Sequence, residues 1–297
     1  MIQNKFKGLG IALITPFKAD GSIDYDALLR LVEYQIKNGA DFLCIMGTTA
    51  ETPCLSLEEK TQLKKLLVER VAGRVPLLMG CGGNNTAAVV HDLKTGDWQG
   101  IDGILSVCPY YNKPSQEGLY QHFKAIAEAS SVPVVLYNVP GRTGVNMTAE
   151  TTLLLARDFQ NIVSIKEASG DITQMDDIIK NKPPHFDVIS GDDGITFPLI
   201  TLGAVGVISV IGNALPAEFS RMVRLALNGD YESARNIHHK FAELFKLLFV
   251  DGNPAGVKAM LHAMGMIENQ LRLPLVPTRL TTMEKISAIL KELDIRI

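Results

Sequence analysis

The chain lacks the sequence signatures of several large protein classes. Its 29 basic and 32 acidic residues leave a net charge of -3, with no basic stripe and no acidic tail. We therefore expect no binding to nucleic acid and none to a membrane surface. The four cysteines form no C-x-x-C pair and no Cys/His cluster, which favours reduced thiols and a cytoplasmic location. The first residues carry charge, but no apolar segment of the kind found in signal peptides follows them.

Two cofactor-binding motifs are also missing. No G-x-G-x-x-G follows the first apolar segment, so the dinucleotide fingerprint is absent. Residues 80–84, Gly-Cys-Gly-Gly-Asn, have the glycine content of a phosphate loop but not its Lys-Ser/Thr ending, and we interpret them as a tight turn. Residues 195–217 carry no charge and are long enough to span a bilayer. Prolines and glycines divide them, so we interpret them as a short helix, a turn and a buried strand. We expect no cofactor and no metal.

Apolar segments do recur along the 297 residues, and amphipathic segments lie between them. The predicted strands are residues 11–15, 42–46, 77–81, 103–107, 134–138, 163–168, 187–191 and 207–210. The amphipathic segments include residues 25–37, 57–71, 116–129 and 148–156. Asp24, Ser56, Ser115 and Thr148 stand at N-cap positions of these helical patterns.

Strands that alternate with helices indicate parallel β-α units, and eight such units close a (β/α)8 TIM barrel. The alternative is a doubly wound open sheet, which the missing glycine fingerprint disfavours. After the last predicted strand the chain continues as helices only. We expect a barrel over residues 1–215 and a C-terminal helical extension over residues 216–297, packed on the barrel or used in a subunit contact.

Lys166 is the most informative single residue, because it lies near the end of the apolar segment 162–168. An ammonium group in a buried strand loses its hydration, and desolvation lowers the pKa of a lysine. Carbonyl chemistry requires a neutral amine, so Lys166 is our candidate for Schiff-base formation. The alternative is a strand-end lysine whose stem packs while its amine reaches solvent.

Catalytic groups of a barrel lie at the carboxyl ends of its strands and in the loops that follow. Several predicted strands end in polar residues that would share this rim. They are residues 47–51 after the second strand, Tyr110 and Tyr111 after the fourth, Tyr137 in the fifth, Lys166 in the sixth, and residues 191–193 after the seventh. Taken singly, Tyr137 could be an ordinary strand aromatic and the Thr48-Thr49 pair a turn. We expect Asp192 and Asp193 to cap the helix that follows.

Alternation along the sixth strand predicts which side chains share the barrel interior with Lys166. Ser164 and Ala168 should point inward, where their small size leaves room for a ligand. Val163 and Glu167 should face the surrounding helices. Glu167 is therefore not our candidate for the catalytic base.

The chain resembles the dihydrodipicolinate synthase family of pyruvate-dependent class I aldolases and lyases over nearly its whole length. The motifs that carry the resemblance are GTTAE at 47–51, CPYYNKPSQEGLYQHF at 108–123, YNVPGRTG at 137–144, IKEASGD at 165–171, SGDD at 190–193 and GVISV at 206–210. The family also implies a cytoplasmic enzyme of lysine and diaminopimelate biosynthesis. It implies a homo-oligomer as well, a dimer or a dimer of dimers (a homotetramer).

The resemblance implies a role for each of these residues. Lys166 would form a Schiff base with pyruvate, and the enamine would attack aspartate 4-semialdehyde. Tyr137 would donate and accept protons through a relay by Thr48 to Tyr111, with Tyr111 crossing from a neighbouring subunit. The pyruvate would be held by Thr49, by the backbone of Ile208 and near Gly191, all at this rim.

Arg142 is the residue that distinguishes a synthase from the related aldolases. In the family pattern this arginine holds the carboxylate of the semialdehyde, and a planar guanidinium suits bidentate carboxylate binding. The alternative reading of the residue is a surface arginine. The alternatives for the whole chain are an aldolase for a sugar acid or a sialic acid, a barrel that only binds a metabolite, and a pyridoxal-phosphate enzyme using Lys166.

The chain departs from the family at the site where some members bind the inhibitor L-lysine. Asn84 and Tyr110 match that site. Leu57 and Lys60 stand where lysine-sensitive members have histidines, and Ala88 stands where they have a glutamate for the lysine ammonium group. We therefore hypothesise weak or absent inhibition by L-lysine.

Overall fold

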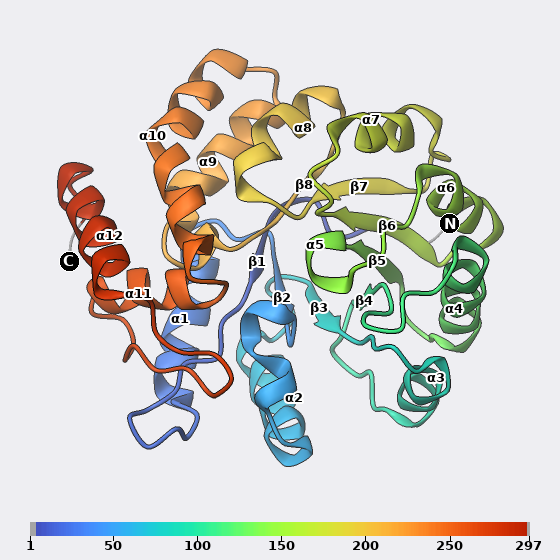
Figure 1. The fold of residues 1–297 in the computed structure, drawn as a ribbon, viewed down its shortest axis with the longest axis horizontal. Coiled ribbons are helices and arrows are strands. Elements are labelled where there is room, and N and C mark those ends of the chain that lie inside the picture. Colours follow the sequence, from blue (N-terminus) through green and yellow to red (C-terminus); the bar gives the residue numbers. More distant parts are fainter. Residues whose placement is uncertain (1–3, 296–297) are drawn as a thin grey trace.

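The computed structural model describes residues 4–295. Eight parallel strands form a closed barrel in chain order, with β1 paired to both β2 and β8 (Figure 1). The strands are Gly8–Ala12 (β1), Phe42–Ile45 (β2), Leu77–Gly80 (β3), Gly103–Val107 (β4), Val134–Asn138 (β5), Ile162–Glu167 (β6), Asp187–Ser190 (β7) and Gly206–Ser209 (β8). The predicted TIM barrel is confirmed.

Each strand is followed by a helix that covers the outside of the barrel (Figure 1). In order these helices are Tyr25–Lys37 (α1), Leu57–Val71 (α2), Thr86–Thr95 (α3), Gln116–Ala129 (α4), Ala149–Asp158 (α6), Ile172–Asn181 (α7), Thr196–Leu202 (α8) and Pro216–Leu227 (α9). A single turn of helix, Pro140–Thr143 (α5), lies between β5 and α6. Residues 195–217 contain α8 and β8, as predicted.

The N-caps that the sequence predicted are present. Asp24 accepts a hydrogen bond from Ala27 N at 2.9 Å. Ser56 and Glu59 form a reciprocal capping box at the start of α2. The Ser115 and Thr148 side chains accept hydrogen bonds from Gly118 N and Thr151 N at the starts of α4 and α6. Because such caps and the amphipathic spacing are local features, the predicted bounds of α1, α2 and α4 are confirmed.

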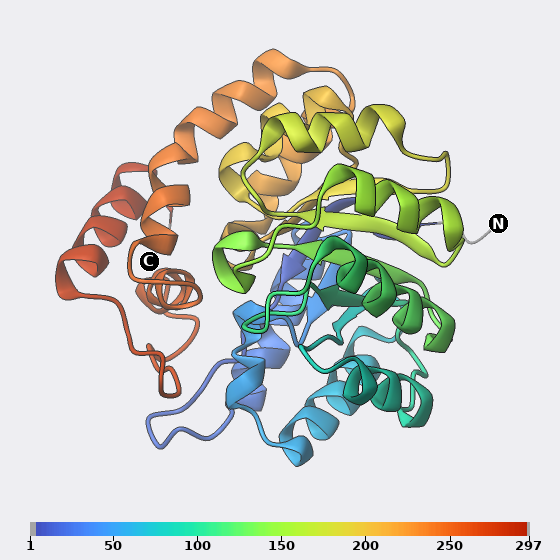
Figure 2. The same ribbon diagram turned by 45° about the vertical axis from the view of Figure 1, so that its right-hand side comes forward.

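Three further helices lie beyond the barrel on one side of the molecule (Figure 2). They are Tyr231–Val250 (α10), Ala255–Ala263 (α11) and Leu280–Glu292 (α12). Helix α10 packs against α9, and α11 packs against α10 and α12. The C-terminal helical extension is thus confirmed. None of the helices within residues 4–295 is long and apolar enough to cross a membrane.

The division of the chain at residue 215/216 stays a prediction. Helix α9 adjoins both parts, because it packs on β1 and on α10. The outermost residues of the two predicted parts, 1–3 and 296–297, lie outside the described residues.

Several strand bounds differ from the prediction by one residue, and two larger differences have a physical reason. Strand β1 begins at Gly8 instead of residue 11, because glycines hid its start. Gly10 belongs to this strand, and a Cβ there would lie 2.2 Å from the Phe42 ring, which fills the barrel interior. The prediction that Val163 faces the helices is also wrong. An irregularity opposite Val134 shifts the pairing of β6, and Val163 packs with the inward residues.

Candidate active site

Lys166 and Tyr137 lie side by side at the carboxyl ends of β6 and β5. The two residues are paired in register, and Lys166 Nζ lies 4.4 Å from the centroid of the Tyr137 ring. Both side chains are buried. Lys166 takes part in none of the ion pairs found among residues 4–295. The alternative of an amine extended into solvent does not hold, and a buried amine beside a phenol is suited to forming an imine.

Gly191 and Ile208 complete the surroundings of this lysine. A Cβ at Gly191 would lie 3.1 Å from Lys166 Cε and 2.7 Å from the Ala168 side chain. Glycine therefore leaves room beside the amine that any other residue would occupy. Ile208 is buried and lies one residue before the carboxyl end of β8, where it is paired with Gly10.

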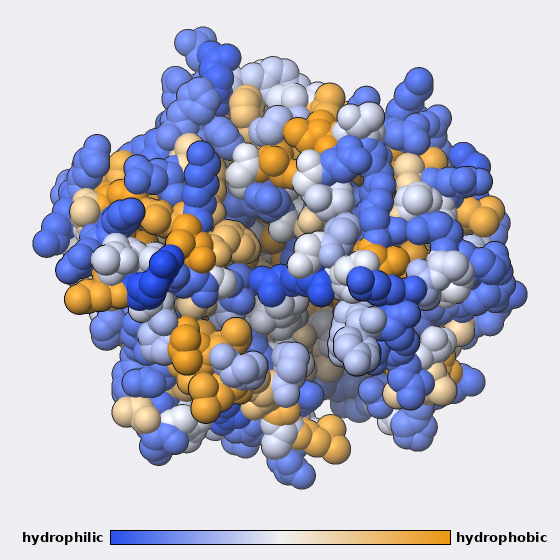
Figure 3. Space-filling view, in the orientation of Figure 1, coloured by the Kyte–Doolittle hydropathy of each residue, from blue (hydrophilic) through white to orange (hydrophobic). Residues whose placement is uncertain are grey.

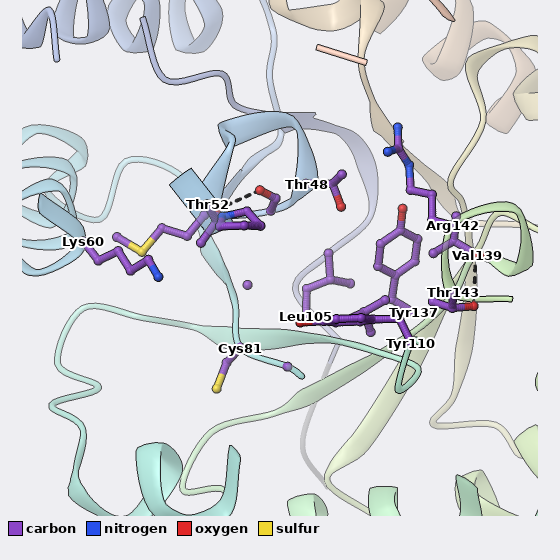
Figure 4. A pocket seen from close by; sticks show the side chains of 16 residues that line it. Thr48, Thr52, Lys60, Cys81, Leu105, Tyr110, Tyr137, Val139, Arg142 and Thr143 are labelled. Carbon is purple, nitrogen blue, oxygen red and sulfur yellow. Dashed lines mark hydrogen bonds between the residues drawn. The ribbon is translucent and has the colours of Figure 1, made fainter. Parts of the chain in front are cut away.

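A cavity of about 410 Å³ opens at this end of the barrel. The face drawn in Figure 3 is hollowed near its centre, between the polar residues of the rim. Tyr137, Thr48 and Arg142 line the cavity, and Lys60 and Cys81 lie on its other side. Figure 4 shows the Tyr137 ring standing in the cavity with its hydroxyl directed toward Thr48 and Arg142. The structure thus brings three of the predicted residues into one cavity.

The lining of the cavity carries positive charge only. Arg142 and Lys60 line it, and no aspartate or glutamate does. Neither cation is in an ion pair with another of the described residues. Burial raises the pKa of Cys81 to about 12, so this thiol is neutral. Such a lining attracts carboxylates and offers no thiolate nucleophile.

The two threonines of the 47–51 motif have different surroundings. They form a 3-10 turn, Thr48–Ala50 (η1), directly after β2. Thr48 is exposed and lines the cavity, whereas Thr49 is buried. Thr49 Oγ1 accepts a hydrogen bond from Asn253 Nδ2 at 2.9 Å. A hydroxyl whose oxygen is occupied in this way keeps its proton for an acceptor such as a carboxylate.

Tyr111 lies apart from the other predicted residues. Its side chain is 89% exposed, and its backbone is left-handed with φ 74°. Its neighbour Tyr110 lines the cavity, but Tyr111 does not. Among the hydrogen bonds of residues 4–295, none joins the Thr48 hydroxyl to Tyr111 or to Tyr137. Within one chain, therefore, the predicted relay is not assembled.

Glu167 faces away from the barrel interior, as predicted. It is fully buried and accepts hydrogen bonds from Asn138 Nδ2 at 3.2 Å and from Gln174 Nε2 at 3.0 Å. Burial raises the pKa of this carboxyl group. Because Gln174 belongs to α7, Glu167 ties the ends of β5 and β6 to the helical layer, directly behind Tyr137 and Lys166.

The prediction that both Asp192 and Asp193 cap the following helix is wrong for Asp193. Asp192 accepts a hydrogen bond from Gly194 N at 2.7 Å and does cap the turn. Asp193 instead accepts from the N–H groups of Val210 and Ile211, at 3.0 and 2.8 Å. Burial raises the pKa of Asp193 to about 6. This carboxylate holds the segment that follows Ile208, a role that depends on two loops being adjacent in the fold.

Sequence reasoning also missed the residues behind the threonine turn. Glu51, the last residue of the GTTAE motif, is buried and lies 2.5 Å from Lys258 Nζ. No local pattern pairs these residues, since Lys258 lies on α11.

Among residues 4–295, no group of three or more His, Cys, Asp or Glu side chains could hold a metal ion.

Comparisons with known proteins extend these observations. The model of the dihydrodipicolinate synthetase family matches residues 5–293. A 4-hydroxy-tetrahydrodipicolinate synthase from Phocaeicola vulgatus is 74% identical, and one from Parabacteroides distasonis is 69% identical, each with 100% of both chains covered. The crystal structure of dihydrodipicolinate synthase from Aquifex aeolicus matches with a TM-score of 0.94 at 42% identity, covering 98% of this chain and 99% of the other. The synthase structure from Thermotoga maritima gives a TM-score of 0.95 at 44% identity, with 97% and 99% covered.

Proposed function

The chain belongs to the dihydrodipicolinate synthetase family, and we propose that Lys166 forms the Schiff base while the other rim residues bind the substrates and transfer protons. The resemblance seen in the sequence is thereby confirmed. The chain is a lyase that condenses pyruvate with aspartate 4-semialdehyde to 4-hydroxy-tetrahydrodipicolinate in the lysine and diaminopimelate pathway.

The covalent step begins at Lys166. Its amine adds to the keto carbon of pyruvate, water leaves, and a protonated imine forms. The imine then acts as an electron sink, so that a methyl proton of pyruvate can be removed to give an enamine. The enamine carbon bonds to the aldehyde carbon of the semialdehyde. Attack by the amino group of the second substrate on the imine carbon then closes the ring and releases Lys166.

Proton transfer in these steps is assigned to Tyr137. Its ring lies 4.4 Å from Lys166 Nζ, and its hydroxyl reaches into the cavity where both substrates would meet. A phenol in this position can give a proton to the leaving water and accept one from the methyl group. Thr48 and Tyr111 would carry the proton onward to solvent.

Carboxylate binding is assigned to two places. Thr49, oriented by Asn253, would hold the carboxylate of pyruvate beside the backbone of Ile208 and the open space at Gly191. Arg142 on α5 would hold the carboxylate of the semialdehyde. Its guanidinium lines the cavity and is not engaged by an acidic partner among the described residues.

The Tyr111 side chain supports an oligomer. This tyrosine is 89% exposed, on a left-handed backbone, and its hydroxyl forms no hydrogen bond with another of the described residues. Leu57 and Leu273 are also strongly exposed, and the Cys54 thiol, lying 3.5 Å from Leu273 O, joins the segments that carry them. Strongly exposed apolar side chains of this kind are typical of an interface. We propose a dimer or dimer of dimers in which Tyr111 enters the partner's site.

A cytoplasmic location is part of the same proposal. All four cysteines are free thiols, which fits a reducing compartment. The enzyme would draw both of its small, soluble substrates from that compartment.

Reductive trapping tests the assignment of Lys166. Borohydride added with pyruvate should increase the protein mass by one reduced pyruvate adduct, and peptide mapping should locate it on Lys166. An unmodified mass, or a tag on another lysine, would contradict the proposal. Analytical ultracentrifugation, together with mixing of inactive Lys166→Met and Tyr111→Phe chains, tests the shared site. Restored activity in the mixture requires Tyr111 to act across the interface.

A further inference from the structure

We propose that a charge cluster, made of the buried Glu51 and Lys258 and the partly buried Arg272, positions the Thr48–Ala50 turn, so that the C-terminal helices set the binding of pyruvate. These three are positioning residues, because they would act on pyruvate only through the turn that carries Thr49. The inference rests on the proposed role of Thr49 in holding the pyruvate carboxylate.

The centre of the cluster is an ion pair between Glu51 and Lys258. Lys258 Nζ lies 2.5 Å from Glu51 Oε1, and both side chains are fully buried. Arg272 N donates a hydrogen bond to the other carboxylate oxygen at 3.0 Å. Glu51 directly follows the turn and has a left-handed backbone, with φ 53°. A non-glycine residue holds this conformation at a cost, and the contacts of its carboxylate hold it in place.

The same cluster joins three further parts of the chain to the turn. Lys258 Nζ donates to Gln270 O at 2.9 Å and lies 4.2 Å above the Phe17 ring. The guanidinium of Arg272 stacks on the same ring at 4.5 Å. It also forms two hydrogen bonds with Glu59 on α2, at 2.6 and 2.7 Å. The turn is thus fixed to α11, to the segment before α12, to the loop after β1 and to α2.

A second contact from the C-terminal region reaches the turn independently. Asn253 lies between α10 and α11 and donates to Thr49 Oγ1 at 2.9 Å. Asn253 is itself buried. The C-terminal segment therefore holds the turn at Thr49 directly and at Glu51 through charge. Two contacts on adjacent parts of one short turn fix both its backbone and the direction of the Thr49 hydroxyl.

Stability alone does not account for a buried ion pair at this place. Burial lowers the pKa of Lys258 to about 8, although Glu51 opposes the shift. Desolvation of two charges offsets much of their attraction, so an apolar pair of the same volume would fold equally well. What an apolar pair does not supply is an electrostatic hold on the carboxylate of Glu51. We infer that this hold is the function of the pair.

The test uses Lys258→Met, Glu51→Gln and the double variant of the full-length protein. The control is Lys182→Met, which removes an ion pair with Asp187 at the opposite end of the barrel. Half-saturation by pyruvate is measured from borohydride trapping, without the second substrate, and the Tm is measured for each variant. KM for the semialdehyde and kcat are then measured at saturating pyruvate.

Each variant of the cluster should require at least tenfold more pyruvate for half-saturation. Semialdehyde KM should stay within twofold and kcat within threefold of the wild type. The double variant should regain much of the Tm that Lys258→Met loses, yet its pyruvate requirement should stay raised. Lys182→Met should lower Tm without changing the pyruvate requirement. A raised pyruvate requirement that does not follow the change in Tm distinguishes positioning from a general loss of stability.

An unchanged pyruvate requirement in the folded variants, with a lowered Tm as in the control, would overturn the inference. If neither single variant folds, the double variant and Asn253→Ala decide, because both leave no buried charge unpaired. Unchanged pyruvate binding in those two would also overturn it. Failure of the proposed function is distinguishable, since the wild-type protein itself would then not be trapped by pyruvate.

Discussion

Lys166 and Lys258 are both buried, and each amine lies above an aromatic ring, at 4.4 Å from Tyr137 and 4.2 Å from Phe17. The two regions differ in what else the amine meets. Lys258 is paired with the carboxylate of Glu51 and donates to a backbone carbonyl. Lys166 has no ion pair among the described residues and lies beside a tyrosine at the cavity. The fold satisfies one ammonium group and leaves the other amine available for chemistry.

The comparison teaches that burial of a lysine does not identify a nucleophile. An acidic partner keeps a buried lysine charged and structural, whereas a lysine without such a partner, beside a proton donor that lines a cavity, is free to react. Each prediction below changes one group and asks whether the two regions respond differently.

The largest effect is expected for Lys166→Met. Loss of the covalent nucleophile should lower kcat by roughly 10⁴-fold or more, and pyruvate trapping should disappear. Because the replaced amine has no carboxylate partner, the Tm should not fall. By contrast, Lys258→Met should lower the free energy of unfolding by about 3–5 kcal/mol, because it leaves the buried Glu51 carboxylate unpaired. Calorimetry and steady-state assays check both. A large loss of Tm in Lys166→Met would contradict the comparison.

The next largest effect concerns Tyr137. Tyr137→Phe keeps the ring above Lys166 but removes the hydroxyl, so proton transfer should be lost while packing is retained. We expect kcat to fall by roughly 10²- to 10⁴-fold, with the Tm within a few degrees of the wild type. The matched control is Tyr34→Phe, whose hydroxyl donates to Ala214 O outside the cavity. Equal activity losses in the two variants would argue against a role in proton transfer.

A third buried basic group, His122, extends the comparison to pH. Among the described residues it has no acidic partner, and it does not line the cavity. Burial lowers its pKa to about 4. Between pH 6.5 and 4 the unfolded chain therefore binds more protons than the folded one, and stability falls as the pH falls. His122 should contribute a loss on the order of 3 kcal/mol over this range. Urea unfolding at several pH values should show a shallower decline for His122→Gln, and parallel curves would refute the prediction.

The next prediction tests whether Arg142 acts on only one of the two substrates. Arg142→Ala should raise the semialdehyde KM by roughly 10- to 100-fold, the effect of losing a charge-assisted pair, while pyruvate trapping stays within twofold. Arg142→Lys should restore little, because an ammonium group does not reproduce a bidentate guanidinium. Initial-rate kinetics with each substrate varied in turn provide the measurement. An equal loss for both substrates would place Arg142 in general positioning instead.

Local patterns allowed much of this fold to be predicted. Helix α1 begins and ends where its caps and amphipathic spacing indicated, because those signals lie within a few residues of one another. Strand β1 was placed too late, since glycines that make room for Phe42 conceal its start. Val163 was assigned to the wrong face, because a strand irregularity is set by its neighbour β5 and not by its own sequence.

The contacts of the candidate site also differ in whether the sequence could predict them. Lys166 and Tyr137 could be paired from the sequence, because consecutive parallel strands end at one rim. Asn253 and Thr49 could not, since they are 204 residues apart and meet only after the C-terminal helices dock. The relay role of Tyr111 was assigned through the family alone, and a single chain does not bring its side chain into a hydrogen bond with Thr48 or Tyr137.

The smallest effect is expected from L-lysine. Asn84 Nδ2 donates to Tyr110 O at 3.1 Å, so the two residues that match the inhibitor site lie together beside the cavity. Lys60 lines the same cavity as Tyr110, and Ala88 supplies no carboxylate. An ammonium ligand would meet a like charge there instead of a partner. We expect less than twofold inhibition at millimolar L-lysine in a steady-state assay. Ala88→Glu combined with Lys60→His should increase the inhibition, and half-inhibition of the unchanged protein below a millimolar would refute the prediction.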